Sequence, residues 1–141
     1  MPDKTKIILL ADDDPEDQEI LVDAITRLDA KVDMHKVDTG KQAVDYLLSC
    51  PESELPCLII LDYSMPVFNA AEVLDHIRHK MVLQPIPKVI WSSSRQPEHV
   101  KPCMEKGAMS YFVKPNKMSE LNDMAQQMLA ICENYPSVTG K

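Results

Sequence analysis

The chain has 141 residues, of which 45% are hydrophobic and 26% are charged, and this balance is typical of one globular domain. A formal net charge of −7 and the lack of a basic stripe in the sequence argue against nucleic-acid binding. The apolar stretches are too short for a signal sequence or a membrane span, so we expect a cytoplasmic protein that does not contact membranes.

The first part of the chain alternates apolar runs with amphipathic segments. Residues 7–11 predict a strand, because a continuous apolar run of this length is typical of a strand buried on both faces. Asp14 and Pro15 then predict a helix start, with the acid as N-cap and the proline at the first helical position. Residues 32–37 alternate as an edge strand does, and residues 40–48 predict a second helix.

The same alternation continues after a polar, proline-bracketed loop at residues 50–56. Strands are predicted at residues 57–61, 86–91 and 110–113, and helices at residues 70–79, 96–106 and 121–132. Pro102 lies inside the fourth predicted helix, so we expect that helix to be short, displaced or kinked. Residues 134–141 predict a flexible C-terminal tail.

Five strands alternating with five helices, about 25 residues apart, predict an α/β doubly wound parallel sheet with right-handed crossovers. In such sheets the functional crevice lies beyond the carboxyl ends of the strands, where the strand order reverses. If the strands at 7–11 and 57–61 are neighbours, they lie about 4.8 Å apart, and the acids that follow them converge.

Polar residues follow four of the predicted strands. They are Asp12, Asp13 and Asp14 after the first, Asp62 after the third, Ser92, Ser93 and Ser94 after the fourth, and Lys114 after the fifth. Acids, hydroxyls and one lysine at a single sheet edge suit an anionic group held together with a divalent metal. Because neither cysteine nor histidine joins this set, the expected metal is Mg²⁺, with Mn²⁺ as a possible substitute, rather than zinc.

The acids differ in their expected roles. Asp14 is explained as the helix cap, which leaves Asp12 and Asp13 facing the crevice. Asp62 is then the natural nucleophile, since a carboxylate can take a phosphoryl group to form an acyl phosphate. The modification adds about −1.5 to −2 charges, which Lys114 and the metal would offset while a serine hydroxyl donates to a phosphoryl oxygen.

Four segments together resemble the receiver domain of two-component response regulators over about residues 6–133. They are Leu10–Asp14, Ile60–Pro66, Val89–Ser93 and Tyr111–Pro115. The resemblance implies a flavodoxin-like (βα)5 sandwich whose five-stranded parallel sheet has the order 2-1-3-4-5. We expect no output domain, and in this the chain resembles stand-alone receivers that are paired with phytochrome-type or hybrid histidine kinases.

The resemblance also implies roles for these residues in a signalling protein that is not an enzyme. By the resemblance Asp62 accepts phosphate from a kinase histidine, with Lys114 and Ser92 contacting the phosphoryl group. The implied Mg²⁺ ligands are Asp12, Asp13, Asp62 and the backbone carbonyl of Ser64. Tyr111 and Ser92 match the switch positions, and Lys114 is expected to precede a cis proline bond.

The resemblance implies protein partners. They are a histidine kinase or hybrid kinase as phosphodonor and a downstream protein that the sequence does not identify. A homodimer through the last helices and strands is compatible with it.

Two other functions stay open at this point. One is a degenerate receiver that binds partners without phosphorylation. Ala70 and Val67 stand where glycines are common, and Trp91 is large for its place before the switch serine. The other is an aspartyl-phosphate phosphatase, which needs a second acid two residues after the nucleophile. Ser64 occupies that position, which counts against turnover of outside substrates.

The cysteines and a histidine pair are given structural interpretations. The cysteines form no CxxC pair and have no metal-ligand spacing, so we expect all four to be reduced and mostly buried. They are Cys50, Cys57, Cys103 and Cys132. His76 and His79 lie three apart on a predicted helix, and we expect them at its polar margin because no third ligand is nearby.

Overall fold

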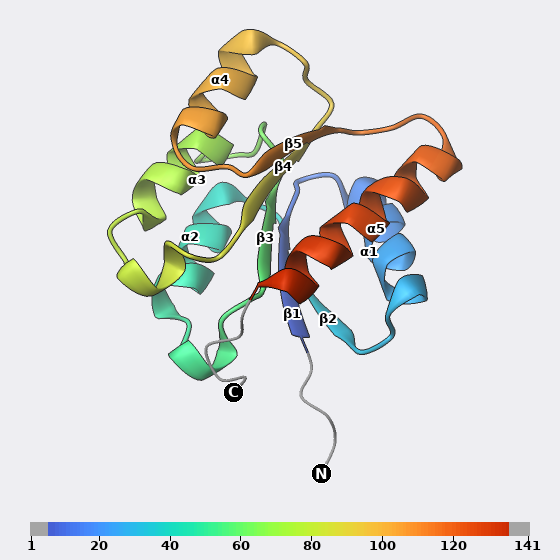
Figure 1. The fold of residues 1–141 in the computed structure, drawn as a ribbon. Coiled ribbons are helices and arrows are strands. Elements are labelled where there is room, and N and C mark those ends of the chain that lie inside the picture. The colour runs from blue at the N-terminus through green and yellow to red at the C-terminus, as the bar shows by residue number, and fades with distance from the viewer. Residues whose placement is uncertain (1–5, 136–141) are drawn as a thin grey trace.

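The computed structural model describes residues 6–135, which form a single parallel sheet with helices on both faces (Figure 1). The strands are β1 (Lys6–Ala11), β2 (Val32–Val37), β3 (Leu58–Leu61), β4 (Lys88–Ser92) and β5 (Ser110–Val113). Their order in the sheet is β2-β1-β3-β4-β5, and every neighbouring pair is parallel. The predicted flavodoxin-like fold and strand order are therefore confirmed.

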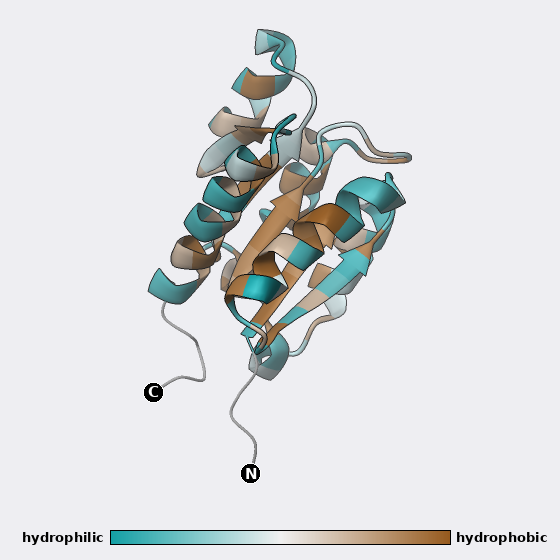
Figure 2. Cartoon of the chain, turned by 90° about the vertical axis from the view of Figure 1, so that its right-hand side faces the viewer, coloured by the Kyte–Doolittle hydropathy of each residue, from teal (hydrophilic) through white to brown (hydrophobic). Residues whose placement is uncertain are grey.

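The helices form two layers around the sheet (Figure 1). They are α1 (Pro15–Leu28), α2 (Gly40–Ser49), α3 (Ala70–Ile77), α4 (Pro97–Glu105) and α5 (Met118–Asn134), with short 3₁₀ turns η1 (Glu52–Glu54) and η2 (Met81–Leu83). Helices α1 and α5 pack together on one face, and α2, α3 and α4 cover the other. Figure 2 shows the result: the central strands are hydrophobic, and the outer helix faces are hydrophilic.

Alternate side chains of the central strands enter two separate cores. On β1, Ile8 and Leu10 belong to the core under α1 and α5, whereas Leu9 belongs to the core under α2 and α3. On β3, Ile60 and Ile59 divide in the same way. Because both faces of these strands are covered, the apolar runs are continuous, and each such side chain contributes about 1.5–3 kcal/mol by burial.

Polar caps fix where the helices begin. The Asp14 carboxylate accepts hydrogen bonds from the backbone N–H groups of Glu16 and Asp17, which confirms it as the N-cap of α1. Asn69 and Glu72 form a reciprocal capping box at the start of α3. The fourth helix has nine residues and contains Pro102, as expected for a short helix.

The loop between β3 and α3 carries the strained residue of the described chain. Val67 has φ 71°, in the left-handed region that β-branched side chains rarely adopt. Gly40, at the start of α2, packs against this loop so closely that a Cβ there would lie 2.1 Å from the Phe68 carbonyl oxygen. The position where a glycine is common in receivers is thus a strained valine here.

The prediction of four reduced cysteines is wrong. Cys57, just before β3, forms a disulfide with Cys132 near the end of α5, with the Cα atoms 5.0 Å apart. The two residues are 75 positions apart, so their spacing along the chain gives no sign of the contact. Cys50 and Cys103 are free and buried, as predicted.

The helices are amphipathic rather than apolar throughout. The longest, α5, has 17 residues and buries one face while Glu120, Asp123 and other polar side chains face outward. Within residues 6–135, no helix has both the length and the apolar character required to cross a membrane. His76 and His79 are exposed on the polar side of α3 and beyond its end, as expected. Of the predicted tail, residues 136–141 lie outside the described part of the chain.

Candidate functional site

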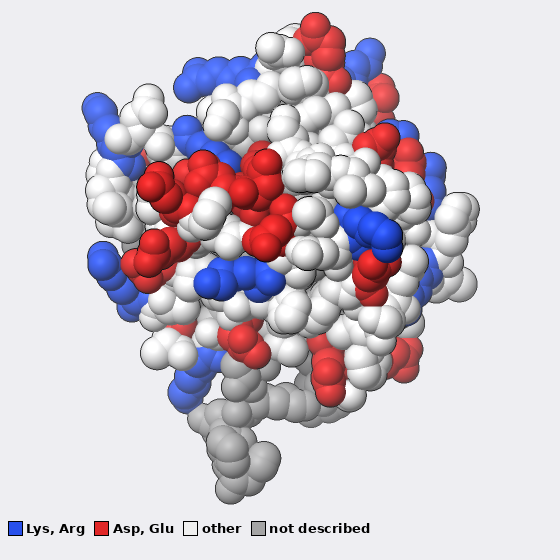
Figure 3. Space-filling model, turned by 180° about the vertical axis from the view of Figure 1, so that it is seen from behind, with Lys and Arg blue, Asp and Glu red and all other residues white. Residues whose placement is uncertain are grey.

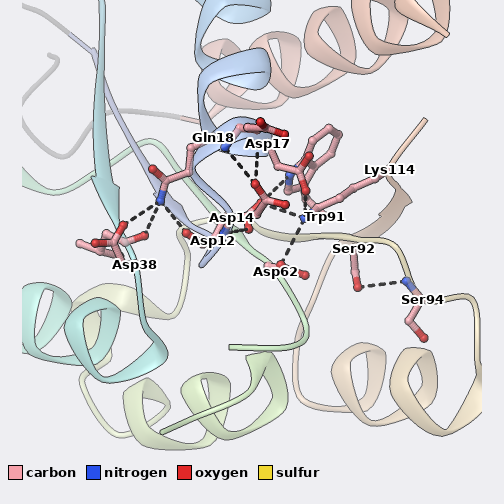
Figure 4. Close-up of polar contacts among 12 residues, drawn as sticks. Asp12, Asp14, Asp17, Gln18, Asp38, Asp62, Trp91, Ser92, Ser94 and Lys114 are labelled. Atoms are coloured by element: carbon pink, nitrogen blue, oxygen red, sulfur yellow. Dashed lines mark hydrogen bonds and ion pairs between the residues drawn. The ribbon is translucent and has the colours of Figure 1, made fainter. Parts of the chain in front are cut away.

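Apart from the fully buried Asp12, the polar residues predicted from the strand ends line one crevice of about 610 Å³. It opens beyond the carboxyl ends of β1, β3, β4 and β5, and Figure 4 shows the side chains around it. Its walls include Asp13, Asp62, Ser64, Ser92, Ser94, Arg95, His99 and Lys114. The sheet thus brings together residues that are more than one hundred positions apart in the sequence.

Three carboxylates form a compact cluster. One oxygen from each of Asp12, Asp13 and Asp62 lies within 4.8 Å of the others. Asp12 is fully buried and Asp62 is 6% exposed, whereas Asp13 is exposed. The pairing of β1 with β3 explains the approach, because the Asp62 N–H donates to the Ala11 carbonyl at 2.9 Å.

This donor set fits a hard divalent cation. All three side chains offer carboxylate oxygens, which Mg²⁺ and Mn²⁺ prefer, and two of them are buried where like charges repel strongly. Ser64 lines the same crevice, although the role of its backbone carbonyl stays a prediction.

Lys114 is the cation that the chain itself supplies to this cluster. Its Nζ lies 2.9 Å from Asp12, 2.7 Å from Asp17 and 3.2 Å from Asp62. Burial alone would lower the pKa of Lys114, but the surrounding carboxylates, Asp17 first, hold it above the usual lysine value. Lys114 therefore stays charged, and one ammonium faces three carboxylates.

The pairing of β5 with β4 fixes the position of Lys114. The Lys114 backbone N–H donates to the Ser92 carbonyl at 2.8 Å, which extends this pairing by one residue. The expected cis bond before Pro115 is not found: the Lys114–Pro115 peptide is trans.

The pKa of the Asp62 carboxylate is higher than that of an ordinary aspartate. Burial raises the pKa of Asp62 to about 7, with Lys114 opposing the increase and the nearby Asp12 charge adding to it. A further positive charge at the cluster would favour the ionised form, which is the nucleophilic one.

The two predicted switch residues meet at Ser94. The Ser92 hydroxyl accepts a hydrogen bond from the Ser94 N–H at 3.2 Å, and the Tyr111 hydroxyl donates to the Ser94 carbonyl at 2.8 Å. Ser92 is buried and Tyr111 is half-buried. The Ser94 hydroxyl also contacts Nδ1 of His99 at 2.6 Å, and the His99 ring stacks on Tyr63.

Helix α1 contributes two site residues that the sequence analysis missed. Asp17 lies in the first turn of α1, where acids are common, yet it makes the shortest contact to Lys114. Gln18 is buried, and its Nε2 donates to the carbonyls of Asp12 and Val37 and to the Asp38 carboxylate. Both follow the Asp14 cap by three or four residues, a spacing that places them on its side of the helix.

Trp91 is a third contact that the sequence did not reveal. Its indole N–H donates to the Asp12 carboxylate at 3.1 Å, and Lys114 Nζ lies 5.8 Å from the centre of its ring (Figure 4). The sequence indicates that a large residue precedes Ser92, but not that it has a polar contact.

Acidic side chains cluster on one face of the molecular surface (Figure 3). Asp and Glu side chains gather into a patch on the back of the molecule, and Lys or Arg side chains lie directly above and below this patch (Figure 3). The excess of acids agrees with the net charge of −7.

Comparisons of the sequence point to one family. Residues 8–126 match the model of the family described as the response regulator receiver domain. The two-component response regulator ORR11 of Oryza sativa subsp. japonica is 30% identical over 122 residues, covering 86% of this chain and 80% of that protein. The regulator ORR7 of the same subspecies is also 30% identical, but the match covers only 56% of its length.

Solved structures share the fold. The phosphorylated cyanobacterial phytochrome response regulator RcpA is similar with a TM-score of 0.83 and 24% identity, covering 94% of this chain and 97% of that one. The Mn²⁺-bound response regulator Rcp1 has a TM-score of 0.72 and 26% identity, with coverage of 89% and 92%. The receiver domain of the Pseudomonas aeruginosa sensor histidine kinase PA1611, solved with magnesium in its cleft, has a TM-score of 0.71 and 24% identity, with coverage of 90% and 99%.

Proposed function

This chain belongs to the response regulator receiver family of two-component signalling, and on that premise we propose that Asp62 is its phosphoacceptor. The observation that carries the proposal is the environment of the Asp62 carboxylate. It is nearly buried at the edge of the crevice, beside the Asp12 carboxylate and 3.2 Å from Lys114 Nζ. We further propose that residues 6–133 make up the receiver domain.

We propose that the acid cluster holds Mg²⁺, for which Mn²⁺ can substitute. Asp12, Asp13 and Asp62 would be the side-chain ligands, and the backbone carbonyl of Ser64 would complete the protein ligands. The bound cation would supply positive charge that offsets the phosphoryl oxygens during transfer.

In the proposed transfer, the Asp62 carboxylate is the nucleophile. An Asp62 oxygen bonds to the phosphorus of a phosphohistidine, and the phosphorus–nitrogen bond breaks with its electron pair leaving on the imidazole. The product is an acyl phosphate on Asp62 and a free histidine on the kinase. Lys114, already poised between three carboxylates, then contacts the phosphoryl group as a compact point charge.

The signal would follow from a shift of Ser92 and Tyr111. In the switched state the Ser92 hydroxyl donates to the phosphoryl group, and the Tyr111 ring moves inward from its contact with Ser94. This is a population shift between two surfaces, recognised by a downstream protein or a second copy of the chain. The chain acts as a signalling phosphoacceptor rather than an enzyme for outside substrates, since Ser64 replaces the acid that a phosphatase needs.

Intact-mass spectrometry tests the proposal. Incubation with acetyl phosphate and MgCl₂ should add one phosphoryl group, and Asp62→Asn should remove this adduct. Asp45→Asn is the matched control, because Asp45 is an exposed acid on α2 that pairs with Lys41. An adduct that persists in Asp62→Asn contradicts the assignment. No adduct from either acetyl phosphate or a phosphorylated histidine kinase would favour the degenerate, phosphorylation-independent binding module.

A further inference from the structure

We propose that Trp91 is a positioning residue for the metal site, because its indole N–H orients the Asp12 carboxylate. The inference rests on the proposed function, since it concerns the same three acids. It gives a role to Trp91, the large residue before Ser92, for which the family resemblance implies no role.

Three donors hold the Asp12 carboxylate. Its Oδ1 accepts from the Asp14 N–H at 2.9 Å, and its Oδ2 lies 3.1 Å from the Trp91 indole nitrogen and 2.9 Å from Lys114 Nζ. Asp12 is 0% exposed and Trp91 is 2% exposed, so water does not compete for these contacts. The carboxylate is therefore fixed in rotation about its last side-chain bond.

The donor count decides which oxygen remains for a cation. A carboxylate oxygen has two lone pairs; Oδ2 accepts a hydrogen bond from Trp91 and is also paired with the Lys114 ammonium. Oδ1 has one donor, the Asp14 N–H, and so keeps a lone pair. Asp12 thus keeps acceptor capacity on Oδ1, while the Trp91 N–H on Oδ2 fixes the direction of the carboxylate.

The Trp91 ring is itself held firmly. It packs in the core under α1 and α5 with Phe112, Leu121 and Ala125. Lys114 Nζ lies 5.8 Å from the ring centre, a distance at which an ammonium is attracted to an aromatic face. One side chain therefore contacts both a metal-ligating acid and the lysine of the site, and it connects them to the α1–α5 layer.

A purely structural explanation competes with this inference. A buried indole usually finds a partner for its N–H, and Asp12 could serve only to satisfy it. The two explanations differ in what the N–H does for the metal: a positioning role predicts weaker Mg²⁺ binding without it, and a packing role does not.

Calorimetric titration with MgCl₂ distinguishes them. Trp91→Phe keeps an aromatic ring and removes the N–H, and we expect Kd for Mg²⁺ to rise about tenfold, the lower end of the range for partners of metal ligands. Tyr46→Phe is the matched control, because it removes a polar atom from a half-buried aromatic residue on α2 whose ring stacks on His35 rather than on a residue of the site. Its Kd should equal that of the unchanged protein.

Nuclear magnetic resonance gives a second readout that does not require a variant of Trp91. The chain has a single tryptophan, so its indole N–H signal is unambiguous. We expect this signal to shift in Asp12→Asn and, in the unchanged protein, to move during the MgCl₂ titration with the calorimetric midpoint.

The outcomes separate the two proposals. Magnesium binding by the unchanged protein together with an unchanged or lower Kd in folded Trp91→Phe overturns the positioning role alone. An indole N–H signal whose chemical shift changes neither in Asp12→Asn nor with MgCl₂ also overturns the positioning role. Absence of Mg²⁺ binding in the unchanged protein overturns the metal site of the proposed function and this inference with it.

Discussion

At the scale of single residues, Lys114 sets the charge balance of the crevice. Its ammonium contacts Asp12, Asp17 and Asp62 while its side chain is only 11% exposed. Removing one partner from a buried charge group costs more than an exposed pair contributes, because the remaining charges stay desolvated. The residue therefore stabilises the fold as well as the proposed phosphoryl group.

We predict that Lys114→Met lowers the free energy of unfolding by about 3 kcal/mol in the absence of metal. Saturating MgCl₂ should restore part of this loss, since a cation bound only by the folded state adds stability. Urea denaturation with and without MgCl₂ measures both effects. Lys41→Met, which breaks an exposed pair with Asp45, is the control and should change stability by less than about 1 kcal/mol. An equal loss in both variants would contradict the prediction.

At the scale of elements, the β3–α3 loop lies between the proposed phosphoacceptor and the capping box of α3. Two of its carbonyl groups accept hydrogen bonds from the starts of neighbouring helices. The Ala70 N–H of α3 donates to the Tyr63 carbonyl at 3.0 Å, and the Gly40 N–H of α2 donates to the Pro66 carbonyl at 3.4 Å. These bonds hold the loop while Val67 keeps its left-handed backbone. The strain is local and is overcome by the contacts around it.

Val67→Gly should therefore raise the free energy of unfolding by about 1 kcal/mol, since glycine adopts φ 71° without the clash of a β-branched side chain. Val67 is 65% exposed, so removal of its side chain loses little burial. Thermal or urea unfolding measures the gain. Val67→Ala keeps a Cβ and should gain less than Val67→Gly. A loss of stability in the glycine variant would show that the strain is not relieved.

At the scale of the whole molecule, one covalent bond ties the sheet to the last helix. The Cys57–Cys132 disulfide joins the chain just before β3 to α5 across 75 residues, so it closes most of the domain into one loop. Cross-linking restricts the unfolded chain, and a loop of this size contributes stability in the upper part of the usual range.

The paired substitution Cys57→Ala and Cys132→Ala should lower the free energy of unfolding by about 2–4 kcal/mol. Dithiothreitol should destabilise the unchanged protein by a similar amount and leave the paired variant unaffected. Thiol titration of the denatured, unreduced protein should find only Cys50 and Cys103. Reaction of all four cysteines without a reductant would contradict the bond.

The sequence by itself determined the strands, the fold and which acids cluster at the candidate site. Buried strands such as β3 are continuous apolar runs, and polar residues such as Asp62 mark where they end. Both signals are local, and parallel pairing carries the strand ends to one edge without further information. The cap role of Asp14 followed from its neighbour Pro15 in the same way.

Only the tertiary structure decided which side chains touch. Trp91 reaches Asp12 across 79 positions, Lys114 reaches Asp17 across 97, and Cys57 meets Cys132 across 75. The first contact joins the ends of β4 and β1, whereas the other two depend on how α1 and α5 pack over one face of the sheet. Periodicity predicts that these helices cover a face, but not which of their residues meet.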